Sequence, residues 1–193
     1  MEAFDKLPRD KRVKIMNAAF DCFGQNGYAK TSMYDIAAAS RISKASLFRY
    51  FGTKKELYLY MFDSACSAII KEMDEGTPDF FDCMRQATRT KMRVTARHPS
   101  MYAFLASVER ETDKELLAAI MELNPSGVNA AYRKIFTNVN WAKLKTGIPK
   151  KVAMNLANYV TDGCLRDNVG KPGDEVMREL EVYYVMLRSV LYR

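Results

Sequence analysis

The sequence contains little of what several common classes of site require. It has one histidine, His98, and its four cysteines form no C-x-x-C pair, which argues against a histidine-rich or cysteine-rich metal site. No apolar run approaches the roughly 18 residues of a membrane span, and residues 1–12 lack the apolar block of a signal peptide. No glycine-rich phosphate loop or nucleophile motif indicates an enzyme. We therefore expect a cytoplasmic, non-enzymatic protein with free thiols, no metal, no cofactor and no membrane partner.

The charge is unevenly distributed along the chain. The 193 residues carry 30 Lys and Arg against 23 Asp and Glu, a net charge of +7. Residues 1–60 hold 11 basic and 6 acidic residues, net +5, while residues 61–193 hold 19 and 17, net +2. Net charge alone is compatible with nucleic acid, an anionic membrane or an acidic partner. Its concentration in the first third favours a basic surface on one part of the molecule.

Helical periodicity predicts an all-α fold of about nine helices, because apolar residues recur three and four positions apart and no run of strands is evident. Ser32 with Asp35, and Thr53 with Glu56, match capping boxes, and Ser43 is a further helix cap. Glycine and proline mark the remaining boundaries. The predicted helices cover residues 8–26, 32–39, 43–51, 53–75, 79–97, 100–110 and 113–138, the last interrupted at 124–127, followed by one from 149 and one from 173 to the C-terminus.

Two of these helices are short and joined by a three-residue turn, after a longer first helix, which is the pattern of a helix-turn-helix. The basic residues of this stretch cluster at helix starts, where unpaired backbone N–H groups attract phosphate. These residues are Lys30, Arg41, Lys44, Arg49, Lys54 and Lys55. A solvated basic face is the alternative for any single charge, but the coincidence with the motif favours DNA.

An ordered set of residues spreads over about residues 12–60. The set comprises Ala18-Ala19-Phe20, Phe23, Gly27-Tyr28, Thr31-Ser32, Ile36-Ala37, Ser43-Lys44, Leu47-Phe48-Arg49-Tyr50-Phe51 and Lys54-Lys55-Glu56-Leu57. In this set the chain resembles the TetR family of bacterial transcriptional regulators. The resemblance implies a helix-turn-helix DNA-binding domain over residues 1–53 and a helical ligand-binding and dimerisation domain over residues 54–193.

The resemblance also assigns roles within the first domain. Thr31 and Ser32 would bind phosphate, and Lys54 would do so with the dipole of its helix. Ser43 and Lys44 would lie over the groove, with Arg49 placed to make a bidentate contact to guanine. The full set of implied DNA-binding residues is Thr31, Ser32, Arg41, Ser43, Lys44, Ala45, Ser46, Phe48, Arg49, Tyr50 and Lys54. Ser43 can equally be a plain helix cap, and Phe48 can be structural.

The turn departs from the family pattern. The family commonly has Ala-Gly-Val here, whereas this chain has Ser40-Arg41-Ile42. Glycine tolerates positive φ, while arginine in that conformation costs on the order of 1 kcal/mol. We expect the turn either to adjust or to hold Arg41 under strain, with a contact to the DNA backbone in return.

In the family the later helices enclose a ligand pocket, and the last two form a four-helix dimer interface. Methionines and aromatic residues are the candidate lining here, although ordinary core is the alternative for each. The candidate pocket residues are Phe62, Phe81, Met84, Met92, Tyr102, Phe104, Met121, Tyr132, Phe136 and Tyr159. The candidate dimer residues are Leu156, Val160, Leu180, Tyr183, Leu187 and Val190.

Together these features predict a homodimeric repressor that a small-molecule effector releases from a palindromic operator in double-stranded DNA. The alternative keeps the DNA-binding dimer but gives the second domain a protein partner or no effector at all. An all-helical enzyme is the third hypothesis, and the single histidine and missing motifs argue against it.

Overall fold

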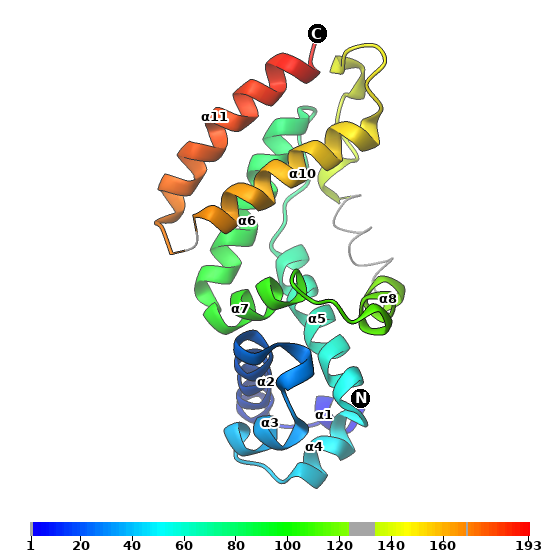
Figure 1. Cartoon of the computed structure of the whole chain (residues 1–193), viewed down its shortest axis with the longest axis vertical. Coiled ribbons are helices and arrows are strands. Elements are labelled where there is room, and N and C mark those ends of the chain that lie inside the picture. The colour runs from blue at the N-terminus through cyan, green and yellow to red at the C-terminus, as the bar shows by residue number, and fades with distance from the viewer. Residues whose placement is uncertain (1, 124–133, 169) are drawn as a thin grey trace. The chain divides into compact units, whose positions relative to one another are not determined.

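The computed structural model describes residues 2–123, 134–168 and 170–193, and helices account for most of them (Figure 1). The helices are α1 (Glu2–Asp5), α2 (Arg9–Lys30), α3 (Met33–Ser40), α4 (Lys44–Phe51), α5 (Lys54–Lys71), α6 (Phe80–Arg97), α7 (Pro99–Val108), α8 (Lys114–Leu123), the 3-10 helix η1 (Trp141–Lys143), α10 (Lys150–Asp167) and α11 (Gly173–Leu191). Within the described residues no strand forms, and Leu144 and Tyr192 make one isolated antiparallel bridge. The prediction of an all-α fold is confirmed.

Several boundaries differ from the sequence prediction. The first long helix was predicted to end at residue 26, whereas α2 continues to Lys30 across a non-helical Gly27 at φ 73°. The helix that was expected to reach residue 75 ends at Lys71, and the short helix α1 was not predicted. Gly76 is buried outside any helix, where its amide donates to the Lys134 carbonyl at 3.2 Å and a Cβ would overlap the carbonyl of Ile135. The predicted interruption at 124–127 lies outside the described residues.

The chain divides into two compact units. Unit 1 comprises residues 1–71 and 94–130, and unit 2 comprises residues 72–93 and 131–193. These are units of packing, so they do not test the functional division expected at residue 53, which stays a prediction.

Aromatic side chains fill the core of unit 1. The ring of Phe104 from α7 lies 5.3 Å from Phe20 and 5.0 Å from Tyr58, and Phe23 lies 4.9 Å from Tyr58. Burying each such ring stabilises the fold by roughly 1.5–3 kcal/mol. At Gly24 a Cβ would approach the Ala103 Cβ to 2.9 Å, so glycine permits close crossing of α2 and α7.

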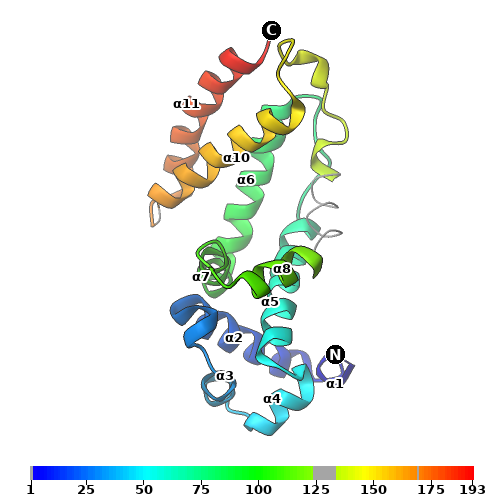
Figure 2. The ribbon, with the colours of Figure 1, turned by 45° about the vertical axis from the view of Figure 1, so that its right-hand side comes forward.

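The core of unit 2 is built from α6, α10 and α11. Figure 2 shows α10 and α11 side by side, and they are in direct contact. Phe81 of α6 packs 6.0 Å from Tyr184 of α11, whose hydroxyl lies 2.7 Å from the Thr161 hydroxyl of α10. This hydrogen bond satisfies two polar groups that burial would otherwise destabilise.

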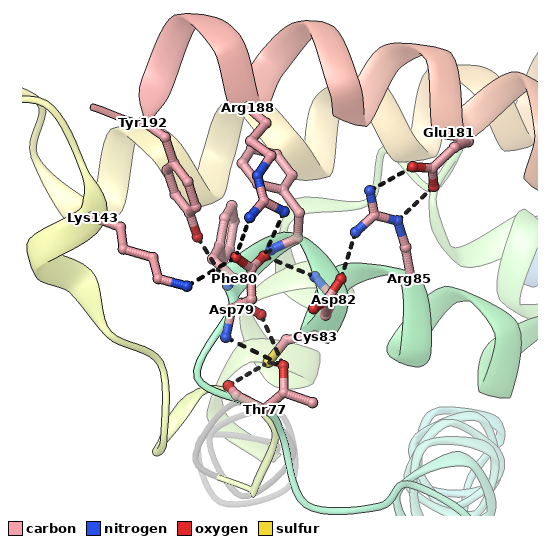
Figure 3. A network of polar contacts seen from close by, with 11 residues as sticks. Thr77, Asp79, Phe80, Asp82, Cys83, Arg85, Lys143, Glu181, Arg188 and Tyr192 are labelled. Carbon is pink, nitrogen blue, oxygen red and sulfur yellow. Dashed lines mark hydrogen bonds and ion pairs between the residues drawn. The ribbon is translucent and has the colours of Figure 1, made fainter.

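Asp79 lies immediately before α6 and is the centre of a network of polar contacts (Figure 3). Its Oδ1 accepts hydrogen bonds from the amides of Phe81 and Asp82 at 3.0 and 3.3 Å, the geometry of an N-cap. Its Oδ2 lies 2.8 Å from an Arg188 Nη2 and 3.2 Å from the Lys143 Nζ. Burial alone would raise the pKa of Asp79, but hydrogen bonds from Lys143 and from the Asp82 amide, with the charge of Arg188, hold it below its ordinary value.

Three further features of the described residues bear on function. No helix among them is long and apolar enough to cross a membrane. No cluster of His, Cys, Asp and Glu among them has the composition of a metal site. All four cysteines are free thiols.

Candidate nucleic-acid interface

The helix α3 begins with a complete capping box. The Ser32 hydroxyl accepts from the Asp35 amide at 3.2 Å, and the Asp35 carboxylate accepts from the Ser32 amide at 2.9 Å. The hydrogen bonds from the side chain and backbone of Ser32 lower the pKa of Asp35. Both residues are exposed, so the predicted cap is confirmed and the Ser32 hydroxyl lies at the surface.

The turn after α3 holds Arg41 in the left-handed region, at φ 56° and ψ 44°. The Arg41 amide donates to the carbonyl of Ala38 at 3.1 Å, and the Ile42 amide donates to Ala37 at 3.0 Å, which closes the end of the helix. Among the described non-glycine residues Arg41 alone has positive φ. The positive φ expected of this turn is therefore present at Arg41, and the contact of its side chain to the DNA backbone stays a prediction.

The helix α4 has an exposed polar face and a buried apolar one. Leu47 and Phe51 are buried, whereas Lys44, Ala45, Phe48 and Arg49 are exposed. Ser43 caps the helix by accepting from the Ser46 amide at 3.1 Å, and Ser46 is half-buried.

The cations of α4 rest on aromatic rings. The Lys44 Nζ lies 5.6 Å from the centroid of Phe48, and the Arg49 Cζ lies 5.2 Å from that of Tyr50. The Arg49 guanidinium also donates to the Tyr50 hydroxyl at 3.3 Å. These contacts restrict the rotamers of both cations, which lowers the entropy cost when either one binds a partner.

Lys54 is held at the start of α5. Its Nζ donates to the carbonyl of Tyr28 at 2.9 Å and lies 4.3 Å from the centroid of the Tyr28 ring. One of the three ammonium N–H groups is thereby used inside unit 1, and two remain for a phosphate oxygen.

Two predicted DNA-binding residues are buried. Thr31 is 2% exposed, and its hydroxyl donates to the carbonyls of Cys22 and Gly27 at 2.9 and 2.8 Å. We correct the predicted hydroxyl contact to phosphate, because this group instead closes the end of α2. Tyr50 is 5% exposed, since its ring packs against Phe4 and Phe51, so it supports Arg49 rather than presenting its own surface.

One exposed aromatic residue was missed by sequence reasoning. Tyr34, in the first turn of α3, is 67% exposed. The sequence pattern could have indicated its exposure. Tyr34 lies two residues after the Ser32 cap and is not part of the apolar stripe that contains Met33 and Ile36. A large aromatic surface beside an exposed cap is suited to packing against deoxyribose or a thymine methyl.

The candidate pocket residues are divided between the units. Phe62, Tyr102, Phe104 and Met121 belong to unit 1, Phe81, Met84, Met92, Phe136 and Tyr159 belong to unit 2, and Tyr132 lies outside the described residues. Phe104 and Phe81 have no exposed surface because they fill the two cores, so for them the core alternative holds. The effector pocket stays a prediction.

The outer faces of α10 and α11 carry exposed apolar side chains. Tyr159, expected in the pocket, is 71% exposed on α10, and Val182 is 60% exposed on α11. The other exposed large apolar residues of these two helices are Val152, Leu156, Tyr183, Val185, Met186 and Val190.

Of the remaining candidate dimer residues, Val160 and Leu187 are half-buried. Leu180 has no exposed surface, because it packs in the core of unit 2, so its place at a dimer surface is corrected.

Helices α2, α3 and α4, with the capped turn and the cationic outer face of α4, define a helix-turn-helix protein. Residues 15–61 match the family model described as bacterial regulatory proteins of the tetR family. Over residues 15–61 the chain therefore carries a domain of the TetR family of transcriptional regulators. This family consists of DNA-binding proteins rather than enzymes, in agreement with the sequence prediction.

Two relatives illustrate the likeness in sequence. The chain is 35% identical over 95 residues to the HTH-type transcriptional repressor Rv3405c of Mycobacterium tuberculosis (strain ATCC 25618 / H37Rv), a stretch covering 48% of this chain and 50% of that protein. The chain thus spans about half the length of this relative. It is 22% identical over 160 residues to the fatty acid metabolism regulator protein of Bacillus subtilis (strain 168), covering 78% of this chain and 79% of that protein.

Solved structures share the fold over nearly the whole chain. The transcriptional regulator FadR from Bacillus subtilis, in complex with stearoyl-CoA, matches with a TM-score of 0.72 at 17% identity, covering 92% of this chain and 97% of that one. A TetR family regulator from Chloroflexus aurantiacus J-10-FL matches with a TM-score of 0.69 at 18% identity, covering 100% and 98%. At these identities the likeness establishes the fold.

Proposed function

We propose that this chain is a transcriptional repressor that binds a palindromic operator as a homodimer and is released by a small-molecule effector. The observation that carries the DNA-binding part is the outer face of α4, where exposed Lys44 and Arg49 are held on aromatic rings beside a capped helix start. The family match over residues 15–61 supports the same role.

In this proposal α4 enters the major groove and the neighbouring elements hold the backbone. Arg49 reads a base edge, with Ala45 and Ser46 beside it, because these side chains lie on or near the exposed face. Ser32 and Lys54 contact phosphates, and Ser43 and Lys44 lie over the groove. Arg41 adds a charge-assisted contact from the turn.

Dimerisation follows from the geometry of DNA. Two α4 helices can read a palindrome only if a two-fold axis spaces them about 34 Å apart, one turn of the duplex. The exposed apolar residues of α10 and α11 supply a surface for this contact. Eight large apolar side chains are exposed on these two neighbouring helices, and burying them in an interface is favourable.

The effector is the least specified part of the proposal. Among similar structures are one in complex with stearoyl-CoA and one named as a flavonoid-responsive regulator. The alternative is a DNA-binding dimer whose second domain has a protein partner or no effector.

Selection of bound sequences from a random DNA pool tests the proposal. We expect a palindrome bound with a Kd of about 10⁻⁸ M or tighter, and a loss of about 10³-fold between 50 and 200 mM salt. A Kd that does not change with salt concentration, or a selection that enriches no sequence, would contradict DNA recognition. Screening small molecules against the selected complex then tests the effector, and the absence of any that releases DNA would favour the alternative.

A further inference from the structure

The C-terminal end of unit 2 contains a cationic hollow of about 840 Å³. Four of its lining residues are basic, namely Lys143, Lys145, Arg188 and Arg193, and none of the nine lining residues is acidic. Asn140 and Ser189 add neutral polar groups. We call this set the cationic hollow.

Backbone contacts hold the walls of the cationic hollow in place. The Lys145 amide donates to the Leu191 carbonyl at 2.8 Å, and the Arg193 amide donates to the Lys143 carbonyl at 3.0 Å. The segment after η1 is thereby fastened to the end of α11. The cations therefore converge on one volume before any ligand arrives, which reduces the entropy cost of binding.

The positive charge of the cationic hollow exceeds its internal compensation. Asp79 is the one carboxylate that bonds these cations in the described part of the chain, and it bonds Lys143 and Arg188 (Figure 3). Four cations against Asp79 leave three positive charges.

Lys145 and Arg193 bond only neutral groups. The Lys145 Nζ donates to the Ser189 carbonyl at 3.0 Å, and Arg193 donates to the Thr146 hydroxyl at 3.0 Å. Most of their N–H donors have no partner within the described chain, since lysine has three and arginine five.

The lining combines the four cations with apolar surface. The face of the Tyr192 ring lies 5.1 Å from the Arg188 Cζ and 6.0 Å from the Lys143 Nζ, so cations already occupy its surroundings. Val185 and Ala142 are the other apolar contributors. We propose that the cationic hollow binds a small, multiply charged oxyanion, bearing phosphoryl or carboxylate groups.

A bound oxyanion would join the segment around Lys143 and Lys145 to the end of α11. Because it binds the folded unit and not the unfolded chain, it raises the melting temperature of the protein. This site uses no residue of the proposed DNA interface, and it shares Val185 with the proposed dimer surface.

Calorimetry and thermal unfolding of the full chain test the site, with sodium pyrophosphate and sodium citrate as probes at constant ionic strength. We expect saturable binding of at least one probe and a rise in melting temperature beyond that given by sodium chloride. Preference for pyrophosphate would identify phosphoryl as the ligand chemistry, and preference for citrate would identify carboxylate.

Neutral variants locate the binding. Lys145→Gln and Arg193→Gln should each raise the Kd about threefold, and together about tenfold, as expected for partly exposed charge pairs. Lys151→Gln, at an exposed lysine of α10 outside the hollow, should leave the Kd unchanged. Lack of saturable binding by either probe, or an unchanged Kd in the double variant, would overturn the proposal.

Discussion

At the scale of single residues, Arg41 combines an unfavourable backbone with an exposed charge. Its φ of 56° places a β-carbon where only glycine is unstrained, and its side chain is exposed next to α4. A non-glycine residue in a strained backbone conformation at the surface suggests that its side chain makes a functional contact, which offsets the free-energy cost of the strain.

Replacing Arg41 separates the strain from the charge. We expect Arg41→Gly to be more stable than Arg41→Ala by about 1 kcal/mol, because glycine relieves the left-handed backbone and alanine does not. Urea unfolding gives this difference. Both variants should lose operator affinity to a similar extent if the side chain contacts DNA, whereas wild-type affinity in both would show that it does not.

Asp79 gives a prediction with a defined pH dependence. Asp79→Asn keeps an N-cap acceptor but loses the ion pairs, so we expect a loss of about 1–2 kcal/mol, with Asp79→Ala losing about 1 kcal/mol more. Since the folded pKa lies below the ordinary 3.8, the ion-pair contribution is complete above that value and disappears as the pH falls through the folded pKa. The stability gap between wild type and Asp79→Asn should therefore shrink from about pH 7 to about pH 3 in chemical denaturation. A stability gap that stays constant with pH would contradict the stabilising role of the Asp79 ion pairs.

At the scale of elements, we expect α4 to determine which DNA sequence is bound and the start of α5 to strengthen binding to any DNA sequence. Arg49→Ala should remove about 1–3 kcal/mol of discrimination at one base pair, because Arg49 is held at the exposed face of α4. Lys54→Ala should weaken all DNA sequences about equally and reduce the salt slope by about 1 per protomer. Binding to a panel of single-base operator variants distinguishes them, with Lys55→Ala as a control. Similar profiles for Arg49→Ala and Lys54→Ala would refute the division between reading and positioning.

Helices whose signals are local were predictable from the sequence. The caps at Ser32 and Ser43 and the proline before α10 depend on neighbours within four residues, and the structure contains all three. At Thr53 the hydroxyl accepts from the Glu56 amide as predicted, but the Thr53 amide donates to Phe51, so the box is half complete.

Features set by distant contacts were not predictable. Phe4 anchors the four-residue α1 through rings 46 or more positions away, a contact that leaves no periodic pattern in the sequence. Burial of Thr31, Tyr50 and Leu180 likewise depends on which helices pack over them. The resemblance could place these residues on the right helices but could not tell which of their faces is covered.

At the scale of the whole molecule, the outer faces of α10 and α11 should control assembly. We expect Tyr159→Glu with Val182→Glu to give a monomer by light scattering, because two charges would be buried in the interface. Operator affinity should fall by about 10²-fold, since each half-site is then bound separately. Met121→Glu, at a site 77% exposed on α8, is the control and should remain a dimer. A dimeric double variant would place the interface elsewhere.

The discontinuous composition of unit 1 has a consequence for the evolution of the family. Because α7 returns to supply Phe104 to the core with Phe20 and Tyr58, the helix-turn-helix cannot be exchanged between relatives as a simple N-terminal segment. A Cβ at position 24 would approach the Ala103 methyl group and the Phe104 backbone nitrogen to 2.9 Å, so α2 and α7 can cross this closely only with glycine there. Relatives in which α7 packs this closely should therefore have glycine at position 24, and a functional chimera should inherit α7 together with the helices that read DNA.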